Sequence, residues 1–208
     1  MIRVLIAEDQ SMIRKALVAL LGLEGDIEVV TEVARGDEIV EQVERVMPDV
    51  ALLDIELPGL DGLAAAAQLR VRCPTVKVII LTTFGRPGYL RRALEAGAVG
   101  YVLKDAPAET LASAIRRATE GKRTVDPTLA VTALSEGGNP LTEREREVLA
   151  ASREDATVAD IARRLFLSEG TVRNHLSTAI QKLEARNRAE ATRIAEQKGW
   201  LDPEEGIR

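Results

Sequence analysis

Aromatic residues are scarce in this chain of 208 residues, which contains two Phe, two Tyr and one Trp. The hydrophobic content of 46% must therefore form cores mainly from Ala, Val, Leu and Ile. The single cysteine, Cys73, excludes an internal disulfide and an all-cysteine metal cluster. No apolar stretch is long enough to span a membrane, and the first residues do not resemble a signal peptide. We therefore expect a cytoplasmic protein without membrane insertion.

Basic charge is also in deficit, since the chain has 28 basic and 33 acidic residues and a net charge of −5. This balance argues against uniform affinity for nucleic acid. The balance reverses between Arg163 and Lys198, where eight residues are basic and four are acidic. If the chain binds an acidic partner such as DNA, this C-terminal region is the expected place.

The first 121 residues alternate between short apolar runs and stretches with helical spacing. The predicted strands are residues 3–7, 27–34, 50–53, 76–82 and 100–103. The predicted helices are residues 11–21, 36–46, 61–72, 88–96 and 107–119. Five strands alternating with five helices indicate an α/β domain whose parallel sheet is covered on both faces.

Polar side chains stand where four of these strands end. Glu8 and Asp9 follow the first strand, Asp54 the third, Thr82 ends the fourth and Lys104 follows the fifth. In a doubly wound sheet these ends converge on one crevice. Carboxylates without His or Cys indicate Mg²⁺, and a carboxylate beside such a metal can attack phosphorus to form an aspartyl-phosphate. A hydroxyl and an ammonium suit the oxygens of the transferred phosphoryl group.

The same residues carry a family resemblance. With the motifs Leu57-Pro58-Gly59-Leu60-Asp61-Gly62 and Gly97-Ala98-Val99-Gly100-Tyr101-Val102-Leu103-Lys104, residues 1–121 resemble the receiver domain of bacterial two-component response regulators. The resemblance implies a flavodoxin-like fold with a five-stranded parallel sheet and five helices. It also implies Asp54 as the phosphoacceptor, with Thr82 and Lys104 contacting the phosphoryl group. The phosphoryl donor would be a partner sensor histidine kinase or a small acyl phosphate.

The resemblance also implies a metal site and a switch. Glu8 and Asp9 would form the acidic pair that binds Mg²⁺ together with Asp54, and the backbone carbonyl of Glu56 would be a further ligand. Tyr101 matches the aromatic switch residue of the family, which turns inward as Thr82 shifts toward the phosphate. An ordinary, half-buried tyrosine is the alternative for Tyr101.

Glycine and proline mark a boundary between the two halves. We predict a partly helical linker over residues 122–140, with its helical segment at 127–134. The second domain, 141–208, opens on a capping box formed by Thr142 and Glu145. Its predicted helices are residues 143–151, 157–165, 169–185 and 188–198. The second and third are joined by a three-residue turn, which fits a helix-turn-helix, although a plain helical bundle for protein contacts is the alternative.

The outward face of the third of these helices favours DNA binding. Arg and Asn can read base edges in the major groove, while Thr, Ser and Lys suit phosphates. The candidate DNA-binding residues are Thr171, Arg173, Asn174, Ser177 and Lys182. The segments 141–149 and 161–176 resemble LuxR-type DNA-binding domains, and that resemblance makes Arg173, Asn174 and Ser177 the base-facing set.

Both halves together resemble the NarL/FixJ class of response regulators. The resemblance implies a transcription factor, not an enzyme, in which phosphorylation of Asp54 favours a homodimer that binds double-stranded promoter DNA. Two alternatives stay open at this point. One is a phosphate-independent dimeric regulator with a structural receiver domain, and the other is a phosphohydrolase that uses Asp54 as an aspartyl-phosphate nucleophile.

Overall fold

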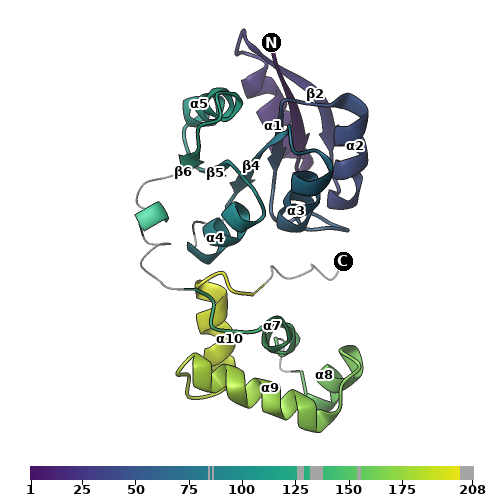
Figure 1. Cartoon of the computed structure of the whole chain (residues 1–208), viewed down its shortest axis with the longest axis vertical. Helices are drawn as coiled ribbons and strands as arrows, with labels where there is room; N and C mark the ends of the chain where they lie inside the picture. Colours follow the sequence, from purple (N-terminus) through teal and green to yellow (C-terminus); the bar gives the residue numbers. More distant parts are fainter. Residues whose placement is uncertain (84, 86, 126–128, 132–137, 154–155, 202–208) are drawn as a thin grey trace. The chain divides into compact units, whose positions relative to one another are not determined.

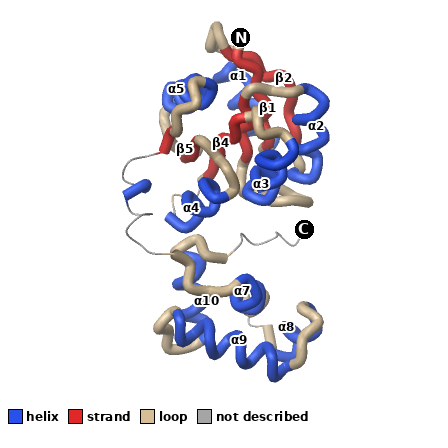
Figure 2. Tube along the Cα trace, in the orientation of Figure 1, coloured by secondary structure: helices blue, strands red, loops and turns tan. Residues whose placement is uncertain are grey.

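The computed structural model describes residues 1–83, 85, 87–125, 129–131, 138–153 and 156–201. The chain divides into two compact units, one formed mainly by Met1–Gly85 and Leu90–Thr132 and the other mainly by Ala133–Asp202. The first unit contains the strands and the second is helical (Figures 1 and 2). In the part of the chain described, no helix has the length and apolarity needed to cross a membrane.

A parallel sheet forms the centre of the first unit, with strand order β2-β1-β3-β4-β5-β6. Its strands are β1 (Ile2–Ala7), β2 (Ile27–Val33), β3 (Val50–Leu53), β4 (Lys77–Thr82), β5 (Gly100–Leu103) and β6 (Thr124–Val125). All four residues of β3 are buried, as expected for a short apolar run covered on both faces. The order reverses between β1 and β3, and such a reversal opens a crevice at the carboxyl ends of the strands.

The sheet has one strand more than the five expected from the sequence. β6 pairs with β5 in parallel, with Gly100 opposite Thr124 and Tyr101 opposite Val125. A strand of two residues is too short to show the alternation from which a strand is recognised. β6 also lies beyond residue 121, inside the stretch expected to be linker.

Helices cover the sheet as the alternating pattern indicates. They are α1 (Ser11–Leu21), α2 (Ile39–Val46), α3 (Gly62–Arg72), α4 (Pro87–Glu95) and α5 (Ala108–Thr119), with a short 3₁₀ turn at Gly36–Glu38 before α2. Leu17 and Leu21 of α1 share one core cluster with Leu111 and Ile115 of α5. The largest fully buried side chains are Leu and Ile, so the core is aliphatic, as the scarcity of aromatics requires.

The described residues of the second unit form four helices: α7 (Glu143–Ala150), α8 (Val158–Arg164), α9 (Glu169–Lys182) and α10 (Arg188–Gln197). The capping box at Thr142 and Glu145 is confirmed, and Thr157 with Asp160 forms a second one. α9 ends three residues earlier than expected because Glu184 adopts φ 51 and the Ala185 N–H donates to the Ile180 carbonyl. That geometry closes a helix and does not continue it.

The stretch between the units is described only in part. Residues 129–131 of the expected helix 127–134 are helical, and the rest of that expected helix lies outside the described residues. The predicted extent of the helical segment in this linker therefore stays a prediction.

Candidate functional site

The register of the sheet brings the expected polar residues to one edge. Ala7 of β1 lies opposite Leu53 of β3, so Glu8 and Asp54 both leave the sheet at this edge. The Asp54 N–H donates to the Ala7 carbonyl at 3.0 Å, and the Lys104 N–H donates to the Thr82 carbonyl at 2.9 Å. Backbone hydrogen bonds thus fix the positions of Asp54 and Lys104 at this edge of the sheet.

Lys104 joins two buried carboxylates at the centre of the site. Its Nζ lies 2.6 Å from Oε2 of Glu8 and 2.9 Å from Oδ2 of Asp54. Glu8 is 1% exposed and Asp54 4%, so both ion pairs are shielded from water. The second oxygen of Asp54, Oδ1, accepts the N–H of Ile55 at 2.7 Å. Both carboxylate oxygens of Asp54 are therefore oriented by a positioned donor.

Burial raises the pKa of both carboxyl groups, and Lys104 only partly offsets the rise. The nearby charges of Asp54 and Asp9 add to the rise in the pKa of Glu8 and of Asp54, respectively. Burial alone would lower the pKa of Lys104, but its hydrogen bonds to Glu8 and Asp54 outweigh that effect and raise it. One ammonium thus only partly offsets the negative charge of the cluster.

The acidic cluster fits a hard metal ion. Glu8, Asp9 and Asp54 each offer an oxygen atom, and these three atoms lie within 4.8 Å of one another. Carboxylate oxygens are the ligands that Mg²⁺ prefers, usually a few of them together with water and phosphate oxygens. The raised pKa of two of the carboxyl groups agrees with a site that is short of positive charge.

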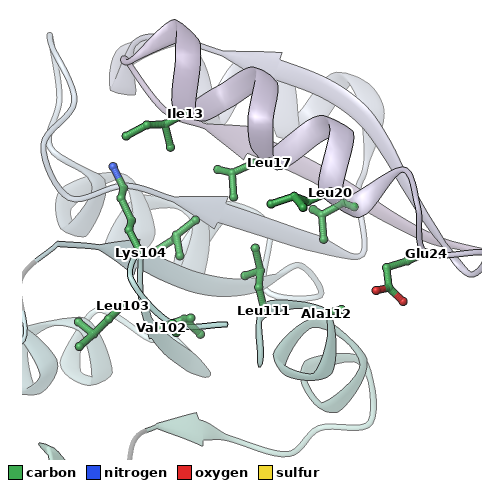
Figure 3. Close-up of a pocket in the computed structure, with 12 residues that line it drawn as sticks. Ile13, Leu17, Leu20, Glu24, Val102, Leu103, Lys104, Leu111 and Ala112 are labelled. Carbon is green, nitrogen blue, oxygen red and sulfur yellow. The ribbon is translucent and has the colours of Figure 1, made fainter. Parts of the chain in front are cut away.

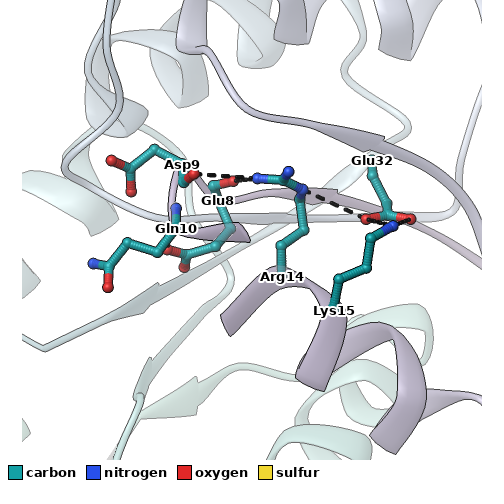
Figure 4. A network of polar contacts seen from close by, with 6 residues as sticks. All are labelled: Glu8, Asp9, Gln10, Arg14, Lys15 and Glu32. Carbon is teal, nitrogen blue, oxygen red and sulfur yellow. Dashed lines mark hydrogen bonds and ion pairs between the residues drawn. The ribbon is translucent and has the colours of Figure 1, made fainter. Parts of the chain in front are cut away.

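Arg14 holds the loop that carries the acidic pair. From the first turns of α1 its guanidinium donates to the backbone carbonyls of Glu8 and Asp9 and forms an ion pair with Glu32 at 3.5 Å (Figure 4). Lys15 pairs with the same Glu32 carboxylate at 3.1 Å. Sequence reasoning missed Arg14, although a basic residue one turn into the helix after an acidic pair is a recognisable signal.

The loop after Asp54 is fixed by close backbone packing. A Cβ on Gly62 would lie 1.8 Å from the Asp54 carbonyl oxygen, so only glycine fits there. The Asp61 carboxylate caps α3 by accepting the N–H groups of Leu63 and Ala64, each at 2.8 Å. The motif Leu57–Gly62 therefore positions Asp54 through its glycine and its cap.

An apolar hollow of about 120 Å³ adjoins the site between α1 and α5. Its lining includes Ile13, Leu17, Leu111 and the aliphatic stem of Lys104 (Figure 3). The stem of Lys104 thus packs among aliphatic side chains, while its ammonium reaches the carboxylates. This arrangement restricts the side chain to the direction of the acidic cluster.

The remaining predicted residues of the first unit lie around this cluster. Thr82 is fully buried at the end of β4, and Tyr101 is 2% exposed on β5, opposite Ile80. Tyr101 is thus more buried than the half-buried residue considered as an alternative. Glu56 is exposed two residues after Asp54, and its role as a carbonyl ligand stays a prediction.

The third helix of the second unit presents most of the expected DNA-binding face to solvent. Ser168 caps α9 by accepting the Thr171 N–H at 3.1 Å. Arg173, Asn174 and Ser177 are exposed, whereas Val172, Leu176 and Ala179 are buried on the opposite side. The guanidinium of Arg173 forms an ion pair with Glu169 at 2.6 Å within the helix. A DNA contact by Arg173 stays a prediction, and it would require this ion pair to open or to be shared.

Lys182 is engaged inside its own unit. Its ammonium lies 2.8 Å and 3.0 Å from the two carboxylate oxygens of Glu145. The Glu145 side chain is 6% exposed and the Lys182 side chain 33%. Burial would raise the pKa of Glu145, but the hydrogen bonds from Lys182 and Thr142 outweigh it and lower that pKa. A phosphate contact by Lys182 stays a prediction, and it would compete with this ion pair.

Comparisons with known proteins cover both units. A family model for the response regulator receiver domain matches residues 4–116. A model for bacterial regulatory proteins of the luxR family matches residues 139–195.

Relatives match nearly the whole chain. The transcriptional regulatory proteins YvfU and DesR of Bacillus subtilis are each 48% identical, and each alignment covers 97% of this chain and 100% of the relative. Among solved structures, the response regulator ChrA of a heme-sensing two-component system is 35% identical with a TM-score of 0.56, over 96% of this chain and 98% of ChrA.

Proposed function

The chain belongs to the NarL/LuxR class of two-component response regulators, and we propose that phosphorylation of Asp54 controls its binding to promoter DNA. Members of this class are DNA-binding transcriptional regulators and not enzymes, and the resemblance inferred from the sequence is confirmed. The phosphohydrolase alternative would need a substrate-recognising cap, but the second unit is a LuxR-type domain. The observation that carries the proposal is the buried cluster in which Lys104 joins Glu8 and Asp54.

The domain boundaries form part of the proposal. We place the receiver at residues 1–125, a few residues longer than the 121 expected, because β6 pairs with β5. The linker then runs to residue 140, and the DNA-binding domain begins at 141. Leu141 supports the second boundary, since it is buried in the helical core.

Phosphoryl transfer would begin at an Asp54 oxygen. This oxygen attacks the phosphorus of a phosphohistidine in the partner kinase, so that an O–P bond forms while the N–P bond breaks and the histidine is released. Lys104 then moves from Glu8 toward the new phosphoryl oxygens, because its ammonium follows the larger negative charge. Thr82, buried at the end of the neighbouring strand, supplies a hydroxyl to the same group.

Glu8, Asp9 and Asp54 would hold a Mg²⁺ ion, with the Glu56 carbonyl as a further ligand. When bound, the ion neutralises charge on the phosphoryl oxygens during transfer. Arg14 serves this site by holding the carbonyls of Glu8 and Asp9, which keeps the acidic pair beside Asp54.

Phosphorylation would favour a homodimer. Movement of Thr82 toward the phosphate changes the packing around Tyr101, and phosphate can shift the population only if it binds the dimer-competent state better. Helix α1 is a candidate contact surface, because its large apolar side chains Met12 and Leu20 are 84% and 44% exposed.

The DNA-binding surface would be the exposed face of α9. Arg173, Asn174 and Ser177 would read base edges, while Thr171 and Lys182 would be candidates for phosphate contacts. A dimer would present two such helices to half-sites about one helical turn apart.

Intact mass and light scattering test the trigger. Wild type, incubated with a small acyl phosphate and Mg²⁺, should gain the mass of one phosphoryl group, and Asp54→Ala should gain none. With beryllofluoride and Mg²⁺, the molar mass should double for wild type alone. If both proteins behave alike in both measurements, Asp54 is not the trigger, and the phosphate-independent regulator becomes the better description.

A further inference from the structure

The turn between α8 and α9 contains an unusual residue. Phe166 adopts φ 55, the left-handed region. Around it the Leu167 N–H donates to the Ala162 carbonyl at 2.9 Å, and the Phe166 N–H donates to the Arg163 carbonyl at 3.4 Å. This pair of hydrogen bonds ends a helix with one left-handed residue, and glycine usually occupies that place because it has no Cβ.

The side chain of Phe166 is almost fully exposed to solvent and is not buried in the folded domain. It is 96% exposed, the highest value among the exposed large hydrophobic residues of the described chain. By contrast Tyr89 and Tyr101, two of the few other aromatics, are buried at 3% and 2% exposure. A strained backbone that carries a bulky, unburied ring is a reason to look for a role outside the folded domain.

The neighbours of Phe166 indicate which partner the ring meets. Arg163 and Arg164 precede it and are exposed, and the Arg163 side chain is 78% exposed beside Asp160. Ser168, two residues later, caps the helix that carries Arg173 and Asn174. In a helix-turn-helix the second helix enters the major groove by its N-terminal end while the first crosses the backbone. The turn that joins them therefore lies at the edge of the groove.

We propose that the ring of Phe166 packs against the apolar surface at the edge of the DNA major groove, while Arg163 and Arg164 contact the adjacent phosphates. That surface is made of thymine C5-methyl groups and deoxyribose carbons. The inference rests on the proposed DNA-binding function, and it adds an apolar contact outside α9 to the polar set on that helix.

The test uses the full chain activated with beryllofluoride and Mg²⁺. The probe is a duplex enriched by the wild-type protein from a random library, and its affinity is measured by fluorescence anisotropy. Phe166→Gly removes the ring and relieves the left-handed strain, so its melting temperature should equal or exceed that of wild type. Its dissociation constant should rise about five- to tenfold, because the apolar contact with the DNA is lost. Phe166→Tyr keeps the ring and should bind within about twofold of wild type.

A matched control comes from the first unit. Met47 is also a large apolar residue at a left-handed position that ends a helix, with φ 44 and 52% exposure. Met47→Gly should leave the dissociation constant unchanged. The salt dependence separates the two kinds of contact, because Arg163→Ala should lower the slope of log affinity against log salt by about one and Phe166→Gly should leave it unchanged.

Replacing thymine by uracil in the duplex identifies the contacted group. If the ring meets a C5-methyl, one such replacement weakens wild type and not Phe166→Gly. If it meets deoxyribose, every replacement affects both proteins equally, while the loss caused by Phe166→Gly remains.

Unchanged affinity of Phe166→Gly, with binding lost in Arg173→Ala, would overturn this inference and leave the proposed function standing. Loss of transcription in vitro by a Phe166→Gly protein that binds DNA normally would also overturn it, because the ring would then face a protein. If wild type enriches no duplex, the DNA-binding proposal and this inference fail together.

Discussion

At the scale of single residues, Lys104 forms ion pairs with two buried carboxylates and is also the proposed contact for the phosphoryl group. The sequence placed it at a strand end as a contact for phosphate, whereas the structure shows it joined to both Glu8 and Asp54. Removing one partner of a buried ion pair leaves an uncompensated charge, which costs more than the pair itself contributes. Lys104 therefore stabilises the unphosphorylated receiver as well as serving the proposed transfer.

Lys104→Met should lower the free energy of unfolding of the receiver by about 3 kcal/mol, because two buried carboxylates lose their cation. Urea denaturation followed by circular dichroism measures the loss. Lys15→Met is the matched control, since Lys15 also pairs with a carboxylate but is 69% exposed, and its effect should stay below about 1 kcal/mol. Equal effects of the two substitutions would contradict this account of Lys104.

The pair of Glu145 and Lys182 leads to a prediction about pH. Because the pKa of Glu145 is lowered in the fold, its stabilisation is complete above its ordinary value of 4.5 and is lost as pH falls through the lowered value. Glu145→Gln should therefore destabilise the second unit by roughly 1–2 kcal/mol at neutral pH. The difference from wild type should shrink below pH 4.5. Urea titrations between neutral and acid pH would detect this, and a difference independent of pH would exclude the ion pair as its cause.

At the scale of elements, the loop from β3 to α3 connects the fold to the site. It begins at Asp54, ends at the Asp61 cap, and passes so close to itself that Gly62 touches the Asp54 carbonyl. The sequence motif indicated a turn here, but the close approach of Gly62 to the Asp54 carbonyl becomes visible only in the folded loop. Any side chain at residue 62 must therefore move Asp54.

Gly62→Ala should destabilise the receiver by about 2 kcal/mol or more, because the new Cβ overlaps backbone atoms that cannot rotate away. Phosphorylation by a small acyl phosphate should slow in parallel. Gly25→Ala is the control, since a Cβ there meets nothing within 4 Å. If Gly62→Ala is phosphorylated at the wild-type rate, the loop does not position Asp54 in the way described.

At the scale of the whole molecule, the chain divides into two compact units, and the described residues include one hydrophobic cluster from each. The sheet and the helices α1 and α5 bury one aliphatic cluster, and the four C-terminal helices bury another, which includes Leu141, Val148 and Val172. Each unit has its own ion pairs across distant residues, Lys104 with Asp54 in one and Lys182 with Glu145 in the other. Separate cores allow separate unfolding.

We expect two unfolding transitions that substitutions move independently. Lys104→Met should lower the midpoint of one transition, and Glu145→Gln should lower the midpoint of the other. Scanning calorimetry of the two variants and wild type provides the measurement. A single transition that both substitutions shift equally would show that the two cores unfold as one cooperative unit.

The sequence by itself determined the architecture and most of the candidate site. Apolar runs that end in Glu8, Asp54 and Thr82 identified both the strands and the edge where their side chains meet, because parallel strands place their carboxyl ends together. The capping box at Thr142 and the buried stripe of Val172 and Leu176 were equally readable. Each of these features depends on residues close together in the chain, so their spacing reveals them.

Only the tertiary structure decided which distant residues meet. β6 has two residues and exists because β5 offers it a pairing edge. The hydrogen bond from Arg14 to the Glu8 carbonyl depends on how α1 packs. The ion pair between Lys182 and Glu145 depends on how α7 packs against α9. The left-handed backbone of Phe166 follows from the hydrogen bonds that close α8. No local period encodes such contacts, because their geometry exists only after the elements have packed.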